Sequence, residues 1–122
     1  MENITFRDEK NKTLFYGVMH KVGIDPEYDP ERAALAYLIT MDDVCRAHIE
    51  EIYDFGRNCI RLNCFRKGWQ TSTSRRTVTL AFNLYNGCST RANSADVLTI
   101  FTGSYQKYYV QALKIRFPHC EW

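Results

Sequence analysis

The residues best suited to bind an anion are concentrated between Gly68 and Arg76. This segment, with the sequence Gly-Trp-Gln-Thr-Ser-Thr-Ser-Arg-Arg, combines hydroxyl groups with two adjacent guanidinium groups. If a helix begins near residues 72–74, its first backbone N–H groups and its dipole favour a negative charge. Arg75 and Arg76 can hold phosphate by parallel hydrogen bonds, and Trp69 offers a flat face on which a base can stack. The alternative interpretation is a polar loop with a capping serine and a core tryptophan.

The charge distribution also points to an anionic partner for the middle of the chain. Up to Asp54 there are twelve acidic residues and six Lys or Arg, but residues 55–95 contain no Asp or Glu. The local charge of +7 in this acid-free segment requires an anion or an acidic surface nearby. A phosphorylated ligand could supply it, as could the acidic first half of a second copy. The cations of the segment are Arg57, Arg61, Arg66, Lys67, Arg75, Arg76 and Arg91.

Further candidate ligand contacts lie later in the chain. Phe82 could stack on an adenine, and Asn83 could pair with the adenine edge through its carboxamide. The alternative is that Phe82 belongs to the core and Asn83 is solvated. Asn93 could read a base in the same way from a loop. Tyr105 could present its hydroxyl to a ligand or pack inside, while Arg116 could contact a phosphate or complement the C-terminus of a helix.

Patterns typical of catalytic sites are poorly represented. The three histidines are isolated from one another, and the acid-free segment lacks the paired carboxylates of a two-metal site. The five cysteines are scattered without a Cys-x-x-Cys pair, which favours reduced, packed thiols over a zinc site. There is no Walker loop and no Gly-x-Gly-x-x-Gly motif. We therefore expect a binding protein that is not an enzyme and holds no metal or cofactor.

Length and composition predict a single domain over residues 1–122. The hydrophobic fraction of 45% and the aromatic fraction of 14% indicate a folded core. No apolar run approaches the roughly 20 residues that cross a bilayer. Residues 1–12 are polar and carry both charge signs, unlike a signal peptide. A cytoplasmic location is the resulting expectation.

Helix signals dominate the first half of the chain. Asp8 is the expected N-cap of a first helix, whose apolar residues recur with a 3.6-residue period up to Gly23. The Asp29-Pro30 pair predicts the start of a second helix, with the aspartate as cap and the proline as first residue. Residues 40 and 43 form a weak capping pair that predicts a third helix.

The second half of the chain is less clear. Residues 56–76 are expected to be irregular. Residues 75–85 alternate like a strand but also fit one helical face, and the Ser/Thr run before them favours a helix. Ser104 is the expected cap of a last helix that Pro118 stops. The predicted class is a mainly α domain of about five helices; the alternative is an α+β domain with a short antiparallel sheet around residues 75–85.

A distinctive set of residues runs through this second half. The set comprises Gly68 to Ser72, Ser74, Arg75, Leu80 to Tyr85, Ser104, Tyr105, Ala112, Lys114, Arg116, Phe117 and Pro118. These residues resemble a family of small proteins from phages and mobile elements of Gram-positive bacteria, which is identified with the phage anti-Thoeris sponge proteins. The resemblance extends over the whole chain in length and order, with conservative departures at Thr73 and Arg76.

The resemblance implies a protein that binds cyclic ADP-ribose isomers made by a bacterial TIR-domain enzyme and does not cleave them. Such sponges are symmetric homodimers or larger homo-oligomers with ligand near the subunit interfaces. In them an aromatic ring stacks on the adenine, a role that Phe82 fits, and an asparagine reads the base, a role for Asn83 or Asn93. The resemblance also implies candidates for the phosphate contacts: Arg75, Arg76, Arg116 and, from a partner subunit, Arg32.

A different class remains as the alternative function: a nucleic-acid-binding or protein-inhibiting accessory protein of a phage or mobile element. The basic segment and Trp69 would allow binding to nucleic acid. A pI near 8.3 is low for a typical basic DNA-binding domain. The complete set of candidate ligand-binding residues is Arg32, Trp69, Gln70, Ser72, Ser74, Arg75, Arg76, Phe82, Asn83, Asn93, Tyr105 and Arg116.

Overall fold

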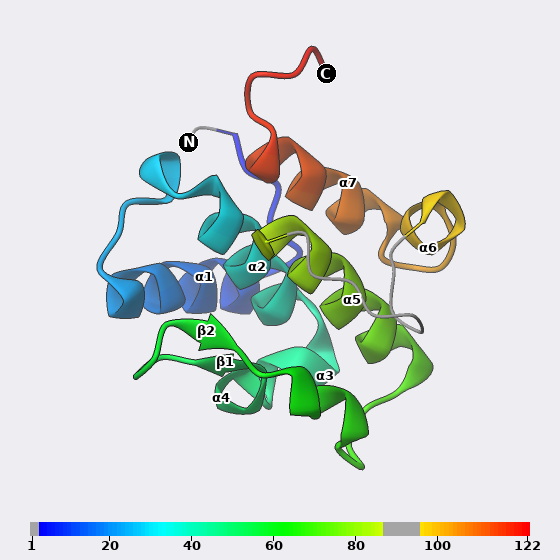
Figure 1. Cartoon of the computed structure of the whole chain (residues 1–122). Coiled ribbons are helices and arrows are strands. Elements are labelled where there is room, and N and C mark those ends of the chain that lie inside the picture. Colours follow the sequence, from blue (N-terminus) through cyan, green and yellow to red (C-terminus); the bar gives the residue numbers. More distant parts are fainter. Residues whose placement is uncertain (1–2, 87–95) are drawn as a thin grey trace.

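The computed structural model describes residues 3–86 and 96–122 (Figure 1). Over these residues the chain is mainly helical with one small antiparallel sheet, which confirms the predicted mainly α class. In chain order the elements are α1 (Glu9–Val22), η1 (Pro26–Tyr28), α2 (Pro30–Met41), α3 (Asp43–Arg46), α4 (Ile49–Ile52), β1 (Tyr53–Asp54), β2 (Cys59–Ile60), η2 (Leu62–Arg66), α5 (Ser72–Asn86), α6 (Val97–Phe101) and α7 (Gln106–Arg116).

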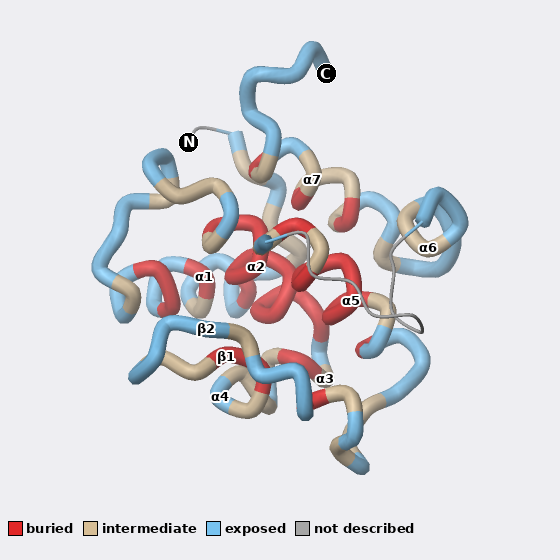
Figure 2. The backbone as a smooth tube through the Cα atoms, viewed as in Figure 1, coloured by how far each residue is buried: buried red, intermediate tan, exposed pale blue. Residues whose placement is uncertain are grey.

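Helix α2 forms the centre of the fold. All of its residues from Ala33 to Met41 are buried, as Figure 2 shows. Helices α1, α5 and α7 pack around it. A helix that is buried on every side is stable only when neighbours cover its whole circumference. Helix α2 therefore determines where the other long helices lie.

The predicted ends of the first two helices are confirmed. The Asp8 carboxylate accepts an amide N–H of the first turn of α1 at 2.7 Å. Gly23 ends the helix with a φ of 74°, a left-handed conformation that residues with a Cβ rarely adopt. The Asp29 carboxylate accepts the Arg32 N–H at 3.0 Å, and Pro30 is the first residue of α2. Local side-chain chemistry thus sets these ends.

The predicted third helix is wrong in two respects. Its cap is Asp42, whose carboxylate accepts the N–H groups of Val44 and Cys45 at 2.9 and 3.0 Å. Thr40 instead lies inside α2, where its hydroxyl donates to the Ala36 carbonyl at 2.7 Å. The expected single helix is also divided into the one-turn helices α3 and α4, because the backbone leaves the helical conformation just before α4.

Asp42 connects four helices through hydrogen bonds. Its side chain follows the end of α2 and caps α3, and the residue is only 2% exposed. The Thr77 hydroxyl of α5 donates to this carboxylate at 2.8 Å, and the Tyr109 hydroxyl of α7 lies 2.8 Å from the Thr77 oxygen. A buried carboxylate needs such bonds to offset its lost hydration. The helices that meet here are therefore held together by hydrogen bonds that centre on the Asp42 carboxylate.

Two arginines join the N-terminal segment to the end of α2. Arg7 donates to the Met41 carbonyl at 2.9 Å and to both carboxylate oxygens of Asp43 at 2.7 and 2.9 Å. Arg46 donates to the same carbonyl at 2.8 Å and to Asp8 at 3.2 Å. Cations at the last carbonyls of a helix complement its dipole. The hydrogen bond from Arg7 is also the main reason why the pKa of Asp43 lies below its usual value.

Residues 56–76 are more regular than expected. Strands β1 and β2 pair in antiparallel fashion, and η2 follows them. The turn between the strands is held by Asp54, whose carboxylate accepts the N–H groups of Gly56 and Arg57 at 3.0 and 3.1 Å. Such an Asx turn is a common use of aspartate before glycine. Strands of two residues are too short to show periodicity in a sequence.

Residues 75–85 are helical, which confirms the favoured prediction for this segment; the alternative of a sheet there is wrong. The apolar residues that alternate like a strand, Val78, Leu80, Phe82 and Leu84, are all buried. A helix can bury so broad a face because α2 and α7 both pack against α5. The apolar residues of this segment alternate as in a strand because two neighbouring helices bury a broad part of the surface of α5.

The last helix ends as predicted but begins differently. Helix α7 ends at Arg116, shortly before Pro118. Ser104 is not its cap, because Tyr105 occupies the N-cap position and makes no side-chain capping bond. In the part of the chain that the structure describes, no helix combines the length and apolar character needed to cross a membrane.

Removing the Asp42 carboxylate should destabilise the fold. We expect Asp42→Ala to lower the free energy of unfolding by about 2–4 kcal/mol, because it leaves buried donors on α3 and α5 without their acceptor. Urea denaturation followed by circular dichroism measures the difference. The matched control is Asp25→Ala, which removes the carboxylate cap of the exposed η1 and should cost less than about 1 kcal/mol. Equal losses in the two variants would contradict the role of Asp42.

The Arg7–Asp43 ion pair should weaken in acid. Because the pKa of Asp43 is lower in the folded than in the unfolded state, its contribution is present above about pH 4 and is lost as the pH falls through the folded value. The carboxylate is 63% exposed, so the effect is small. Asp43→Asn should lower the unfolding free energy by about 0.5 kcal/mol at pH 6 and have no effect near pH 2. Urea midpoints at both pH values test this, and a difference that persists at pH 2 would argue against it.

Candidate functional site

One side of α5 carries several of the candidate residues. Ser72, Arg75, Arg76 and Asn83 are spaced so that they lie on one side of a helix, opposite the residues that pack on α2. Ser72 and Arg75 are exposed, and the other two are partly exposed. From Ser72 to Asn83 the helix rises by about 16 Å. We call these four residues the polar strip of α5; Thr79, which lies between them on the same side, is only 7% exposed, so the strip is exposed mainly at its Ser72 end.

The start of α5 is capped by its own side chains. The Thr71 hydroxyl oxygen accepts the Ser74 N–H at 3.0 Å, and the Ser74 hydroxyl oxygen accepts the Thr71 N–H at 2.7 Å. This reciprocal arrangement is a capping box. The Ser74 hydroxyl also donates to the Gln70 side chain at 2.5 Å, and Gln70 donates to the Cys64 carbonyl at 3.1 Å. Ser74 and Gln70 therefore stabilise the helix start, and their side chains are engaged within the protein.

Arg75 and Arg76 differ in how they are held. The Arg75 side chain is exposed and makes no hydrogen bond or ion pair with any residue in the ranges 3–86 and 96–122. Arg76 reaches across to the loop between α6 and α7, where its guanidinium donates to the Thr102 carbonyl at 3.3 Å. One arginine of the pair is thus free to contact an anion, and the other is already partly ordered beside it.

Gly103 allows Arg76 to take this position. A Cβ at Gly103 would lie 2.7 Å from Nη1 of Arg76, and Gly103 itself has a φ of +88°. Both the close approach and the left-handed backbone favour glycine. Sequence reasoning missed this residue, because a lone glycine between helices does not indicate which side chain will pack on it.

Other cations of the acid-free segment are partly neutralised by the acidic half of the chain. Arg61 lies 3.3 Å from the Asp54 carboxylate, and Lys67 lies 3.8 Å from the Glu51 carboxylate. The two halves of the sequence therefore compensate one another within the fold. The excess positive charge that remains on exposed side chains is smaller than the sequence alone indicates.

Trp69 packs against a histidine. Its ring and that of His48 are stacked, with centroids 4.2 Å apart and planes 3° from parallel. His48 Nδ1 lies 2.7 Å from the Glu51 carboxylate, and this bond is the main reason why the pKa of Glu51 is lowered. The Trp69 N–H is buried without a hydrogen bond of normal geometry to any described residue, yet it contributes to lowering the same pKa. One ring face of Trp69 is thus covered and not available to a base.

Phe82 lies in the core. It is 1% exposed and meets the ring of Phe65 edge-to-face at a centroid distance of 5.5 Å. Both faces of its ring are covered by protein, so an adenine has no access to it in this structure. The interpretation of Phe82 as a core residue, considered above as the alternative, fits this burial.

Arg32 and Arg116 lie near the other end of α5. The Arg116 guanidinium donates to the Leu84 carbonyl at 2.7 Å, so it complements the C-terminus of α5 rather than that of its own helix. Arg32 bonds the Asp29 carboxylate at 2.7 Å and lies 5.7 Å from the ring centre of Tyr85. Both arginines are engaged within the protein and are separated along α5 from Arg75.

The last two candidates do not join the polar strip. Tyr105 is half-buried at the start of α7, with the Arg7 guanidinium 5.3 Å from its ring centre. Burial is the main cause that raises the pKa of its hydroxyl. Asn93 lies outside the described residues.

The buried cysteines are poor nucleophiles. Burial raises the pKa of Cys45 well above its usual value and that of Cys64 to about 12. Both thiols are therefore protonated near neutral pH, whereas the thiolate is the reactive form. Within residues 3–86 and 96–122 no group of three or more His, Cys, Asp or Glu side chains is placed to hold a metal ion.

The contact between Gly103 and Arg76 can be tested by a double-mutant cycle. We expect Gly103→Ala to lower the unfolding free energy by about 1–3 kcal/mol, through backbone strain and displacement of Arg76. In an Arg76→Ala background the same change should cost less, because the steric contact is absent. Thermal or urea unfolding of the four proteins measures the coupling. Full additivity would show that Gly103 does not position Arg76.

Comparison with known proteins adds a family but no activity. No curated protein and no solved structure matches the chain. A family model matches residues 1–121, and the description of that family is "Family of unknown function (DUF6075)". Because the match extends over almost the whole sequence, the polar strip of α5 and the elements that position it all fall within it. The chain belongs to the DUF6075 family.

Proposed function

We propose that the protein is a non-catalytic binding protein that holds a phosphate-bearing nucleotide on the polar strip of α5. The observation that carries this proposal is the pair Arg75 and Arg76 on one helix face: the first has no partner among the described residues, and the second is held at the Thr102 carbonyl. Guanidinium groups bind phosphate oxygens through strong charge-assisted hydrogen bonds. A partly ordered arginine loses less conformational entropy when it binds.

The ligand in this proposal is a cyclic ADP-ribose isomer, as the resemblance to anti-Thoeris sponges implies. Arg75 and Arg76 hold its phosphates, and the Ser72 hydroxyl donates to a phosphate oxygen. Asn83, about 10 Å further along the helix from Arg76, reads the base edge. Phe82 has no part in the site, because its ring is buried. Capture of the messenger would block TIR-based defence without any chemical change to the ligand.

A second copy of the chain completes the site in this proposal. One exposed helix face leaves a bound dianion in contact with water, where charge-assisted bonds are weak. A partner subunit laid over the polar strip would exclude that water and strengthen each bond. The protein is therefore proposed to act as a homodimer or a larger homo-oligomer, with the ligand near the subunit boundary.

The proposal is tested by calorimetry with cyclic ADP-ribose isomers and with inorganic pyrophosphate. Arg75→Ala should weaken binding of the cyclic nucleotide at least about tenfold, because it removes a charge-assisted contact. Arg57→Ala is the matched control: Arg57 is also exposed and also lacks a side-chain partner among the described residues, but it lies in the β1–β2 turn. The control should bind like the wild type.

Three results would contradict this function. Equal weakening by both variants would indicate a non-specific charge effect. Recovery of a hydrolysed nucleotide after heat denaturation would indicate an enzyme, whereas sequestration requires the ligand to return unchanged. Salt-sensitive binding of random DNA in a gel, without binding of the nucleotide, would favour a nucleic-acid-binding module.

A further inference from the structure

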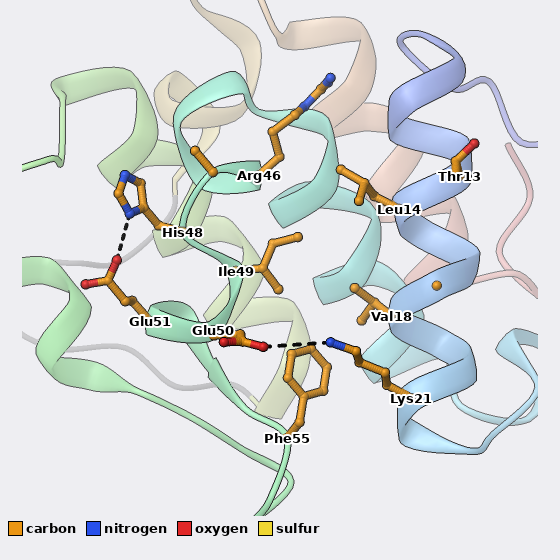
Figure 3. A pocket seen from close by; sticks show the side chains of 12 residues that line it. Thr13, Leu14, Val18, Lys21, Arg46, His48, Ile49, Glu50, Glu51 and Phe55 are labelled. Atoms are coloured by element: carbon orange, nitrogen blue, oxygen red, sulfur yellow. Dashed lines mark hydrogen bonds and ion pairs between the residues drawn. The ribbon is translucent and has the colours of Figure 1, made fainter.

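A groove of about 640 Å³ lies between α1 and the α3–α4 segment (Figure 3). Leu14 and Val18 of α1 point across it towards Ile49 of α4, and Phe55 lies at one end. Its volume is within the range of about 300–1,000 Å³ that is typical of small-molecule sites. The groove is open to solvent, and its lining combines five apolar side chains with six polar or charged ones. It shares no residue with the polar strip of α5.

Gly17 is one of the residues that line this groove. It lies in the middle of α1, between Leu14 and Val18, where glycine is among the least favourable residues for a helix. A Cβ added at Gly17 would find no atom within 4 Å, so packing inside the protein does not require a glycine there. The missing side chain instead gives access to the apolar floor.

Each charged residue around the groove has at least one partner within the protein. Lys21 and Glu50 form an ion pair at 3.8 Å across one end, and His48 bonds Glu51 at 2.7 Å (Figure 3). The Arg46 side chain is only 6% exposed; its terminal nitrogens bond a carboxylate and a backbone carbonyl, whereas its buried Nε has no hydrogen-bond partner among the described residues. A charged ligand would therefore have to compete with these internal partners. A charged molecule would lose hydration on the apolar floor without compensation, whereas an uncharged one would gain from burial.

We propose that this groove binds an uncharged, largely apolar small molecule. The site uses the hydrophobic effect, with Leu14, Val18 and Ile49 as its floor and Gly17 as its entrance. It is independent of the phosphate site proposed on α5, because neither the ligand chemistry nor the residues overlap.

The test uses the uncharged fluorescent probe N-phenyl-1-naphthylamine, whose emission rises in apolar surroundings. The wild type should bind it at one site. Gly17→Leu should weaken binding at least about tenfold by filling the entrance, while raising the melting temperature by about 2–4 °C because leucine favours the helix. The control Lys12→Leu places the same side chain on an exposed part of α1 outside the groove and should keep the affinity of the wild type.

Several outcomes would overturn the proposal. One is the absence of probe binding to the wild type. Another is equal binding to Gly17→Leu and Lys12→Leu, which would place the probe elsewhere on the surface. Light scattering adds a third: a wild-type dimer that becomes a monomer in Gly17→Leu would mean that a second copy of the chain occupies the groove. Displacement of the probe by pyrophosphate would show that the two sites are not independent.

Discussion

The fold depends on the buried carboxylate of Asp42 at the end of α2. A charge taken out of water is tolerated only when hydrogen bonds replace its hydration, and here α3 and α5 supply them, with Tyr109 of α7 extending the network. Because α2 is buried on all sides, its neighbours must meet closely around this point. Arg7 and Arg46 hold the same helix end from the N-terminal side. Together these bonds determine which face of α5 is turned outward.

Several of the candidate ligand-binding side chains make contacts within the protein. Ser74 caps the start of α5 and donates to Gln70. Arg116 donates to the Leu84 carbonyl near the end of the same helix. Phe82 contributes to the core. A side chain engaged in this way would have to give up an internal contact to bind a ligand, which subtracts from the affinity. Arg75, without such a contact among the described residues, can bind an anion without that loss.

The two surfaces proposed as binding sites have opposite physical character. On the polar strip of α5 the charge of Arg75 is not neutralised by any described residue, so attraction to an anion drives binding there. Around the groove beside α1 each charged side chain has an internal partner, so in that proposal the apolar side chains of the floor contribute most of the binding. One small domain can hold both because they lie on different helices, with α2 between α1 and α5.

The sequence by itself determined the helical class, the ends marked by Asp8, Gly23 and the Asp29-Pro30 pair, and the helical conformation of residues 75–85. These features depend on capping, periodicity and charge, which act within a few residues of the chain. Local patterns were insufficient where distant contacts matter. The sequence predicted a cap at residue 40, whereas the tertiary structure uses Asp42, whose carboxylate also reaches Thr77.

Only the tertiary structure decided which candidate side chains are free. It buried Phe82 and brought Gly103 against Arg76. It also opened a groove between α1 and α4 at Gly17. Each of these outcomes depends on contacts between segments far apart in the chain. Such contacts follow from how the helices pack around α2, and the spacing of residue types along the sequence does not encode them.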